Sequence, residues 1–574
     1  MNERADRSGP GIHRVPVLIV GGSLVGLSTS VFLGRLGVRH TLVERHAGTS
    51  IHPRGRGNNV RTMELFRVSG TEPDIRRAAA TLADNHGILQ TPTLAGDAGE
   101  WLFKQIDPGN GLARFSPSGW CLCSQNDLEP ELLAHARALG GELRFGTELL
   151  SFDADAEGVT AIVRNRETGE NTTIRADYLV AADGPRSPVR EQLGIGQSGP
   201  GDLFHNISIT FRSRRLADVV GDRRFIVCYL TAPDADGALL PVDNRVDWVF
   251  HAPWHPETGE TLEDFTDERC AAHIRRAIGD PDLDVEITGK APWHAAQRVA
   301  RGYRSGRVLL AGDSAHEMSP TGAFGSNTGI QDAHNLAWKL AAVLDGWAGD
   351  GLLDTYDAER RPVAEATSAR AAARSAEHSH PGFAPPPAAG GGGGPQRGIL
   401  NVALGYRYPQ GAVVGADPAT PVVPDALSLT GEPGSRAPHL WLRRGDDRVS
   451  TLDLYERTLV LLSDATEPSG WHEAATRLAH ETRIPLTPYR VGKSPDAELL
   501  PEDDDTDWAK AHGVTRGGAV LVRPDGFVAW RAPGPAPDPA AMLRQVLASV
   551  LSLPDSTDVA RPEPSVSGMV HAGG

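Results

Sequence analysis

The sequence predicts an α/β protein that consists of a Rossmann-like domain, an antiparallel sheet inserted into it, and a second α/β domain near the C-terminus. Three observations support this prediction. A strand, a glycine-rich turn and a helix open the chain; alternating apolar residues mark the region 196–294; and a run of proline and glycine follows residue 375. Alternation with period two is typical of half-buried strands, and short apolar runs between helical patterns are typical of parallel sheets.

The N-terminal segment has the pattern of a dinucleotide-binding turn. An apolar strand over residues 17–20 leads directly into Gly21-Gly22-Ser23-Leu24-Val25-Gly26, and a helical pattern follows. The next short strand ends at Glu44, where a carboxylate is suited to bind a ribose hydroxyl. Gly21 allows the tight turn and Gly26 allows close packing of helix and strand, whereas Ser23 replaces the middle glycine of the usual motif. We therefore expect a dinucleotide to bind here.

A second strand-loop-helix segment lies much later in the chain. The apolar run 308–311 stops at Gly312-Asp313, and an apolar-periodic helix begins near Asn327. The free amides at a helix N-terminus attract an anion or an electron-rich ring edge. Taken alone, this segment is also compatible with an ordinary turn, but beside the N-terminal fingerprint it predicts a ligand-binding loop.

The composition excludes several classes of partner. A formal net charge of −16 without a strongly basic block argues against nucleic acid and against an anionic membrane. The first 14 residues hold no apolar core for a signal peptide, and no run approaches 18 apolar residues. Four cysteines do not make a disulfide framework, which indicates a reduced, cytoplasmic protein. Cys121 and Cys123 have no partner pair nearby, so we predict no metal site.

The C-terminal part contains strand patterns at 459–462 and 486–491, a hairpin around Pro524-Asp525-Gly526, and a helix that Asp538-Pro539 begins. This order resembles a thioredoxin-like module, but the segment contains no cysteine and therefore cannot carry out dithiol chemistry. A scaffold or a dimer contact is the alternative role. The predicted domains are a nucleotide-binding domain over 15–195 and 295–375, a substrate-binding sheet over 196–294, a flexible linker over 376–400, a thioredoxin-like domain over 401–553, and a disordered tail over 554–574.

Three segments together resemble the class A flavin-dependent aromatic hydroxylases, which share the p-hydroxybenzoate hydroxylase fold. They are the fingerprint with Glu44-Arg45, the segment DYLVAADGPRSPVR at 177–190, and the segment around Gly312-Asp313. Together with the cysteine-free C-terminal module, the chain resembles the aromatic polyketide hydroxylase branch. It is most similar to tetracenomycin-type hydroxylases, followed by anthracycline (aklavinone-type) hydroxylases. The resemblance thus implies an enzyme of antibiotic biosynthesis.

The loop at 320–327 departs from the pattern of the family. The family usually has P-x-G-G-x-G-x-N there, whereas this chain has PTGAFGSN. Ala323 and Phe324 would therefore add bulk beside the flavin ring.

The resemblance implies noncovalently bound FAD, with NADPH or NADH as co-substrate and dioxygen as oxidant. The residues implied to contact the cofactor are Gly21, Ser23, Gly26, Glu44, Arg45, Arg56, Gln125, Asp183, Asp313, Gly325, Ser326 and Asn327. In this scheme the glycine-rich turn faces the pyrophosphate, Glu44 holds the adenosine ribose, and Asp313 contacts the ribityl chain. Asp183, with Arg186 and Arg190, would serve both FAD and the nicotinamide cofactor, or would instead form a salt-bridged turn.

The implied reaction is hydroxylation of a polycyclic aromatic polyketide, a small molecule, through a flavin hydroperoxide. The flavin supplies the reactive species, so the protein positions the substrate and excludes water. A base that deprotonates the phenol would help, and His52, His205, His294 and His316 are candidates, although a structural role is the preferred interpretation for each. The alternatives are a Baeyer–Villiger-type oxygenase on the same scaffold, a flavin dehydrogenase or oxidase that adds no oxygen, and a noncatalytic flavin-binding protein. A homodimer is compatible with the sequence.

Overall fold

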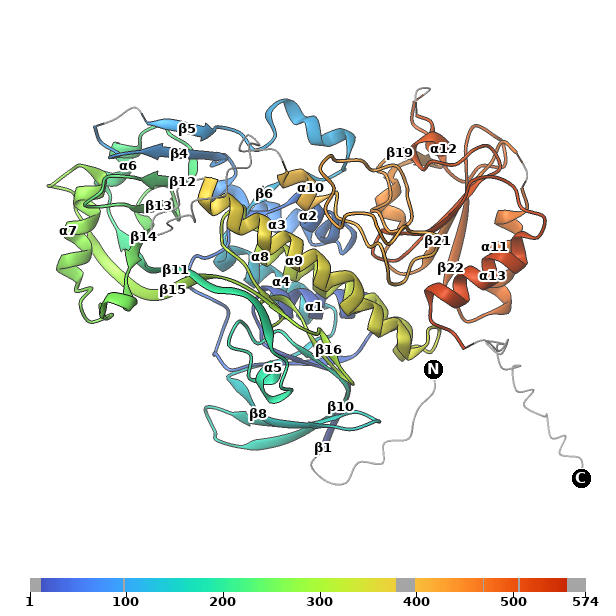
Figure 1. The fold of residues 1–574 in the computed structure, drawn as a ribbon, viewed down its shortest axis with the longest axis horizontal. Helices are drawn as coiled ribbons and strands as arrows, with labels where there is room; N and C mark the ends of the chain where they lie inside the picture. Colours follow the sequence, from blue (N-terminus) through green and yellow to red (C-terminus); the bar gives the residue numbers. More distant parts are fainter. Residues whose placement is uncertain (1–11, 97–98, 378–397, 468, 504–505, 555–574) are drawn as a thin grey trace, which may run out of the picture.

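Two eight-stranded sheets and one four-stranded sheet organise the chain, and two long helices, α8 (Phe324–Leu344) and α9 (Asp354–Glu377), run through the middle of the molecule (Figure 1). The computed structural model describes residues 12–96, 99–377, 398–467, 469–503 and 506–554. In this part of the chain, none of the helices combines the length and the apolar character that crossing a bilayer requires.

The first eight-stranded sheet is the predicted Rossmann-like sheet. Its main path has the order β16-β17-β10-β1-β2-β7, and neighbours from β17 to β7 are parallel. Val17, Leu18 and Ile19 are fully buried, as expected for a parallel strand covered on both faces. The strands are β1 (Ile12–Val20), β2 (His40–Glu44), β7 (Glu142–Phe145), β8 (Thr147–Ala154), β9 (Val159–Asn165), β10 (Asn171–Ala181), β16 (Arg304–Ser305) and β17 (Val308–Leu310). Around it lie α1 (Leu24–Arg35), α2 (Val60–Val68), α3 (Glu72–Ala78), α4 (Gln125–Ala138) and α5 (Pro188–Gln192).

The second eight-stranded sheet has the order β18-β15-β11-β14-β13-β12-β4-β5 and is antiparallel except for the pair β12–β4. It confirms the predicted antiparallel sheet but is larger than the range 196–294, because strands from 87–103 and 286–317 join its two ends. Its strands are β4 (Gly87–Thr91), β5 (Glu100–Phe103), β11 (Gln197–Arg212), β12 (Phe225–Leu230), β13 (Gly237–Pro241), β14 (Asp247–Trp254), β15 (Glu286–Ala300) and β18 (His316–Glu317). Helices α6 (Arg215–Val220) and α7 (Asp267–Ile278) cover one face.

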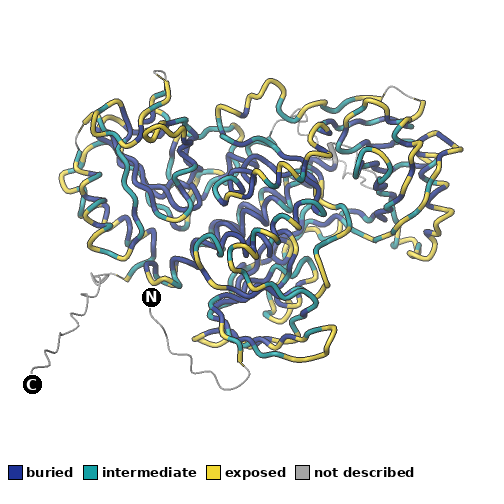
Figure 2. The backbone as a smooth tube through the Cα atoms, turned by 180° about the vertical axis from the view of Figure 1, so that it is seen from behind, coloured by how far each residue is buried: buried dark blue, intermediate teal, exposed yellow. Residues whose placement is uncertain are grey.

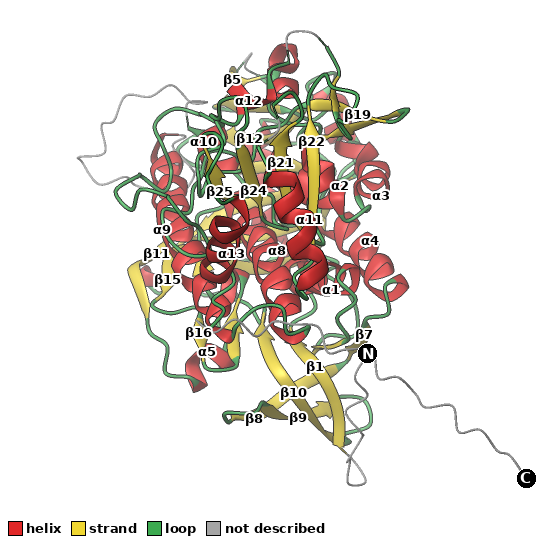
Figure 3. Cartoon of the chain, turned by 90° about the vertical axis from the view of Figure 1, so that its right-hand side faces the viewer, coloured by secondary structure: helices red, strands yellow, loops and turns green. Residues whose placement is uncertain are grey.

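The C-terminal part is built on a four-stranded sheet of order β22-β21-β24-β25, in which only the pair β21–β22 is parallel. Figure 3 shows two of its helices, α11 and α13, in front of these strands. The predicted start of the last helix is confirmed, because the Asp538 side chain accepts a hydrogen bond from Ala541 N at 2.9 Å. The strands and helices are β21 (Leu459–Asp464), β22 (Leu486–Val491), β24 (Ala519–Val522), β25 (Val528–Ala532), α11 (Trp471–Glu481), α12 (Trp508–Ala511) and α13 (Pro539–Val550).

The remaining elements are short. A separate sheet contains β19 (Trp441–Arg444), β20 (Asp447–Ser450) and β23 (Leu500–Pro501), and β3 (Gly57–Asn58) pairs with β6 (Cys121–Leu122). α9 extends to Glu377 and α10 (Ile399–Ala403) follows. Most of the predicted linker, and nearly all of the predicted tail, lies outside the described residues.

The first and last domains meet in a buried network of ions between α8, α9 and the β24–β25 hairpin. Arg523 Nη1 lies 2.6 Å from Glu359 Oε1, and Arg523 Nη2 lies 2.5 Å from Asp525 Oδ2. Lys339 Nζ donates to Glu359 Oε2 at 2.8 Å. The four side chains are at most 2% exposed, and Figure 2 shows buried backbone continuing through the middle of the molecule. The hairpin turn is therefore part of the interior and ties the two domains together.

Candidate active site between two sheets

The three sequence motifs meet at one edge of the Rossmann-like sheet. The parallel strands β1, β10 and β17 end side by side, so the turns that follow them are neighbours. Ala182 N donates to Val20 O at 2.8 Å, and Ala311 N donates to Ala181 O at 2.9 Å. In open α/β sheets, ligands bind at this carboxyl edge of the strands.

The glycine-rich turn has no room for larger residues. Gly21 has φ +106°, and a Cβ on it would lie 2.1 Å from Ala182 O; a Cβ on Gly26 would lie 1.9 Å from Gly21 O. Glu44 Oε2 accepts a hydrogen bond from Gly22 N at 2.7 Å. The carboxylate at the end of β2 thus holds the turn itself, and Arg45 is exposed directly after it.

A buried carboxylate that the sequence reasoning missed organises the polar residues of this turn. Glu129 on α4 accepts hydrogen bonds from Ser23 Oγ at 2.5 Å, from Gln125 Nε2 at 2.7 Å and from Ser50 N at 2.8 Å. Gln125 Nε2 also donates to Ser23 Oγ at 3.0 Å. The structure therefore brings Ser23 and Gln125 together, and the spacing of Gln125 and Glu129 on one helix face is the signal from which this pair was predictable.

Arg56 lies in the loop between β2 and α2 and is 5% exposed. Its Nη1 donates to Pro241 O in the second sheet, whereas Nε and Nη2 have no hydrogen-bond partner among the described residues. Burial lowers the pKa of Arg56 to about 10, and Asp127 opposes that shift. A buried guanidinium with two unsatisfied nitrogens is costly, so this geometry calls for an anionic or strongly polar ligand.

The turns after β10 and β17 are tied to each other by Arg190. Its Nη1 donates to Ser314 O at 3.0 Å and its Nη2 to Pro185 O at 2.9 Å. Asp183 Oδ2 accepts from Val189 N at 3.2 Å, and Oδ1 is buried without a partner in the described structure. Burial raises the pKa of Asp183. A salt-bridged turn was the alternative interpretation of the sequence. Among the described residues Asp183 forms no ion pair, and the turn is held by the Val189 N–H and by the Arg190 side chain.

The N-terminus of α8 closes the loop that carries Arg56. Asn327 Oδ1 accepts from Asn59 N at 2.8 Å, and Asn327 Nδ2 donates to Gly57 O at 2.8 Å. Gly325 and Ser326 are half-buried beside it. Ala323 has φ 54°, a left-handed conformation that costs a non-glycine residue roughly 1 kcal/mol. Phe324 is buried in a cluster with Ala371 and Val402, and this cluster accommodates its ring.

Asp313, in the turn after β17, is exposed, and Gly312 beside it has φ +64°. The surrounding protein raises the pKa of Asp313, mainly through desolvation, with His316 acting in the opposite direction.

The residues at this edge fit FAD. The evidence is the narrow turn at Gly21, the unpartnered Oδ1 of Asp183 in the neighbouring turn, and the unpartnered nitrogens of Arg56 in the loop that the N-terminus of α8 closes. A dinucleotide presents phosphate oxygens and hydroxyl groups that match these donors and acceptors.

The second sheet presents a polar and aromatic face to the same loop. Residues of one strand alternate between faces, and Ile207, Ile209 and Phe211 belong to the apolar core on the α7 side. Asn206 and Ser208 therefore point the other way, and Ser208 Oγ lies 2.8 Å from His52 Nε2 in the Arg56 loop. The register places Trp293 beside Asn206 and His251 beside Ser208. The His251 and Trp293 rings meet edge to face with centroids 5.1 Å apart.

Two features of this face were not predicted from the sequence. Asn206 is fully buried, and neither its Oδ1 nor its Nδ2 has a hydrogen-bond partner among the described residues. Tyr229 on β12 is buried, which raises its pKa to about 12, and the nearby Arg374 of α9 acts in the opposite direction. The alternating pattern of a strand predicts which residues share a face of the sheet. It cannot predict that Arg374, on a helix about 145 residues later in the chain, lies near Tyr229.

The four candidate histidines lie in different environments. His316 Nε2 lies 2.7 Å from Asp332 Oδ2 in the core, where Arg360 also binds Asp332, so His316 has a structural role. His294 Nε2 lies 3.3 Å from Glu317 Oε2, and the hydrogen bond that His294 donates to this carboxylate raises the pKa of His294. His205 lies 4.0 Å from Asp202. Only His52 contacts the polar face of the second sheet.

The four cysteines are free and buried. In the part of the chain that the structure covers, no group of three or more histidine, cysteine, aspartate or glutamate side chains is arranged to hold a metal ion.

Comparisons with known proteins agree with this geometry. A family model described as "FAD binding domain" matches residues 14–371, and one described as "Aromatic-ring hydroxylase, C-terminal" matches residues 430–554. A Streptomyces coelicolor protein provisionally named a polyketide hydroxylase is 77% identical over 96% of this chain and 100% of its own length. The tetracenomycin A2 monooxygenase-dioxygenase of Streptomyces glaucescens is 42% identical over 95% of this chain and 98% of its own.

A solved structure gives the same result. The crystal structure of aklavinone-11 hydroxylase with FAD and aklavinone has a TM-score of 0.84 and 38% identity, and the match covers 94% of this chain and 99% of that chain. The predicted resemblance is thereby confirmed. The chain belongs to the FAD-dependent aromatic-ring hydroxylases, a family of monooxygenases.

Proposed function

We propose that this enzyme hydroxylates a polycyclic aromatic polyketide of the tetracenomycin type, with NADPH or NADH as electron donor and dioxygen as the source of the oxygen atom. The observation that carries this proposal is the polar, aromatic face of the second sheet, which contacts the Arg56 loop through His52 and Ser208. A flat, oxygenated ring system matches a surface that combines aromatic rings with an unpartnered amide. The names of the relatives support the same substrate class.

FAD would be held by the residues at the edge of the first sheet. Gly21, Ser23 and Gly26 would lie along the pyrophosphate of FAD. Arg56 would donate hydrogen bonds to FAD through Nε and Nη2, and the Asp313 carboxylate would accept a hydrogen bond from FAD. We extend the same proposal to Glu44, Arg45, Gln125, Asp183, Gly325, Ser326 and Asn327. When bound, FAD supplies the redox chemistry that activates dioxygen. The protein itself binds and orients the substrate and excludes water from it.

The substrate would lie between the face of the second sheet and the Arg56 loop. Trp293 and His251 would contact the ring edges, and the Asn206 amide would hydrogen-bond a carbonyl or hydroxyl oxygen of the substrate. This arrangement orients the substrate and excludes water from it, because Asn206 and Ser208 are buried. The guanidinium of Arg374 lies close enough to Tyr229 to oppose the rise in its pKa. It would equally favour the ionised form of a substrate phenol, which is the more reactive nucleophile.

Three further assignments complete the proposal. The C-terminal domain is a thioredoxin-like module, which is supported by the order and directions of its four strands and by α11 and α13. A cytoplasmic location is supported by four unpaired cysteines. The protein acts as a monomer or as a homodimer.

The test begins with the visible spectrum of the purified protein. NADPH oxidation is then followed with and without a tetracenomycin-type precursor under labelled dioxygen. The proposal expects a flavin spectrum, strong stimulation by the precursor, and label in the product, with the number of labels counting the insertions. A product without label would indicate a dehydrogenase or oxidase, and a lactone in the product NMR spectrum would indicate a Baeyer–Villiger reaction. The absence of a flavin spectrum after reconstitution with FAD would contradict the proposal.

Anthracyclines are the second candidate substrates, and the match to aklavinone-11 hydroxylase over 99% of that chain favours them. The same assay with an aklavinone-type substrate distinguishes the two. The better substrate is the one with the higher kcat/KM for coupled NADPH oxidation.

A further inference from the structure

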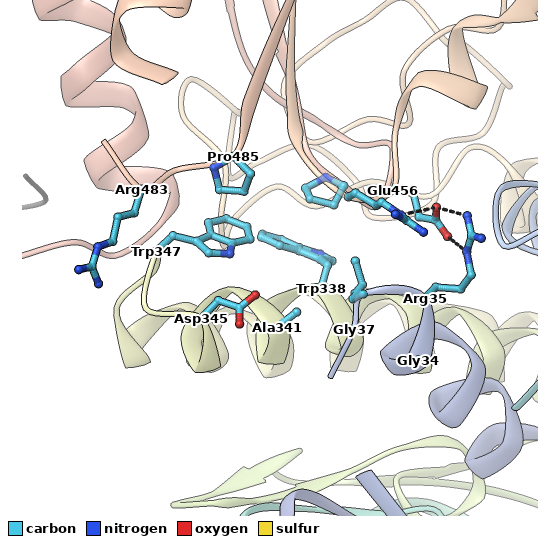
Figure 4. Close-up of a pocket in the computed structure, with 13 residues that line it drawn as sticks. Gly34, Arg35, Gly37, Trp338, Ala341, Asp345, Trp347, Glu456, Arg483 and Pro485 are labelled. Atoms are coloured by element: carbon cyan, nitrogen blue, oxygen red, sulfur yellow. Dashed lines mark hydrogen bonds and ion pairs between the residues drawn. The ribbon is translucent and has the colours of Figure 1, made fainter. Parts of the chain in front are cut away.

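A cavity of about 630 Å³ lies between the first and last domains, far from the site described above. α8 starts at the flavin-binding edge, and the cavity borders Trp338 and Asp345 near the other end of this helix (Figure 4). With a rise of 1.5 Å per residue, Trp338 is about 16 Å along the helix from Asn327. No residue of the Arg56 loop lines this junction cavity, so a ligand in it would occupy a separate site.

The apolar part of the cavity lining comes mainly from two tryptophans and two prolines. The rings of Trp338 and Trp347 are stacked, with an interplanar angle of 24° and centroids 6.4 Å apart. Pro485 (Figure 4) and Pro524 of the last domain also line the cavity. Indole and proline surfaces pack well against planar rings. The volume falls within the range of small-molecule sites.

The polar groups of the cavity leave positive charge unmatched. Glu456 binds Arg35 through both oxygens, at 2.9 and 2.7 Å. Arg457 lies 3.7 Å from the same carboxylate, and Arg483 forms no ion pair or hydrogen bond with any described residue. Asp345 is the remaining carboxylate of the lining. The lining thus holds three arginines and two carboxylates, an excess of one positive charge.

Two independent features indicate that the cavity is a built site rather than a simple gap between domains. Trp338 is 1% exposed, yet its Nε1 has no hydrogen-bond partner within the described structure. A buried N–H without a partner costs about 1–3 kcal/mol unless a ligand accepts from it. Glu456 has φ 151°, a conformation that L-residues rarely adopt. Such strain is concentrated at ligand-binding positions.

We propose that the junction cavity binds a planar, hydroxylated aromatic anion, with its ring against Pro485 and the edge of Trp347 and its anionic group between Arg457 and Arg483. A hydroxyl group on the ring would donate to Asp345, and a ligand oxygen would accept from Trp338 Nε1. A cation would meet an excess of arginine, and an uncharged ring would leave Arg483 without a counter-charge. The site stands independently of the proposed reaction.

The experiment is calorimetric titration of the FAD-loaded enzyme with 3-hydroxy-2-naphthoate, while the flavin absorbance spectrum is recorded at each step. Spectral changes report probe that binds beside the flavin, so heat without a spectral change reports the junction cavity. The matched uncharged probe is 3-hydroxy-2-naphthamide. Arg457→Gln and Arg483→Gln each remove one exposed cation from the cavity. Arg477→Gln makes the same charge change on an exposed position of α11 outside it and serves as the control.

We expect saturable binding of one equivalent of naphthoate without a flavin spectral change. The amide binds about tenfold more weakly, and each cavity variant weakens naphthoate binding by about tenfold, as expected for loss of a charge-assisted hydrogen bond. Arg477→Gln binds as the wild type does. The proposal fails if no such binding occurs up to 1 mM probe. It also fails if the Arg457→Gln/Arg483→Gln double variant binds naphthoate as tightly as the wild type.

Discussion

Arg523→Met tests how strongly the buried ion network joins the first and last domains. Arg523 donates four hydrogen bonds to carboxylates, two to Glu359 at 2.6 and 2.9 Å and two to Asp525 at 3.0 and 2.5 Å. Burial would raise the pKa of Asp525, but Arg523 outweighs that effect and holds it at about 2. Removing this one cation leaves Lys339 as the main counter-charge of two buried carboxylates.

Breaking a buried ion pair by removing one partner costs about 3–5 kcal/mol, because the other partner stays desolvated. For a unit of 150–250 residues, that corresponds to a fall in the melting midpoint of roughly 6–20 °C. The matched control is Arg448→Met. Arg448 also binds a carboxylate through two hydrogen bonds, at 2.6 and 2.9 Å to Glu502, but its side chain is 54% exposed. Loss of such a surface pair costs less than about 1 kcal/mol.

The assay is thermal and urea unfolding of the two variants and the wild type at pH 7.5 and pH 5. In wild type the lowered pKa of Asp525 contributes stability that is present above the unfolded pKa and is lost only as the pH falls toward 2. In Arg523→Met the pKa values of Glu359 and Asp525 rise, so the folded protein binds more protons than the unfolded chain. The loss in free energy of unfolding, relative to wild type, should therefore be smaller at pH 5 than at pH 7.5. A loss no larger than that of Arg448→Met, or one that grows at pH 5, would refute this reasoning.

Three further predictions concern the two sheets. Arg56→Met should weaken FAD binding at least tenfold in titrations of the apoenzyme, because two buried donors are lost, whereas Arg54→Met on the exposed part of the same loop should bind FAD normally. Asn206→Leu should raise the melting midpoint of the unliganded protein, because it removes an unpartnered buried amide, and should lower kcat/KM for the polyketide about tenfold or more; unchanged kcat/KM would contradict the role of Asn206. The pKa of His294 is raised in the folded protein, so its stabilising contribution is complete below pH 6.5 and is lost as the pH rises through the folded pKa. As the pH rises from below 6.5 through that pKa, the melting midpoint of His294→Gln should therefore fall less than that of wild type.

The nucleotide-binding edge was predictable because its geometry follows from local patterns. A strand that ends in Gly21, another in Glu44 and a third before Gly312 must place their turns together once the strands are parallel, since carboxyl ends share one edge. The structure brings these turns together through backbone hydrogen bonds such as Ala311 N to Ala181 O. Whether the individual residues bind FAD stays a prediction.

The features of the fold that the sequence did not predict depend on contacts between distant segments. β4 pairs with β12 across more than 130 residues of chain, and no pattern in 87–91 indicates that partner. The turn Pro524-Asp525-Gly526 has the composition of a surface turn, yet Asp525 is 3% exposed because Arg523 and Asn335 bind its carboxylate. Turn chemistry predicts the local backbone conformation but carries no information about what the turn packs against.

The C-terminal domain contains no cysteine, and its contacts with α2 give it a structural task. Arg436 binds both oxygens of Glu64 on α2, the Asp525 carbonyl accepts from Arg61 on the same helix, and the Arg61 guanidinium lies 5.6 Å from the centroid of the Phe527 ring. α2 follows directly on the loop that carries Arg56, and the residue before the helix, Asn59, donates to Asn327 at the start of α8.

The loop that carries Arg56 is therefore restrained at its C-terminal end by two domains. Because α2 is restrained, the loop is already organised in the free protein and loses less conformational entropy when a ligand binds. Without the C-terminal domain, Glu64 and Arg61 would still pair with each other, but Glu64 would lose Arg436 and Arg61 would lose the Asp525 carbonyl, so this ion pair would be less well satisfied. This gives a physical reason why buried charges, in addition to the apolar contacts of Trp338 and Trp347, join a domain without redox groups of its own to the flavin domain.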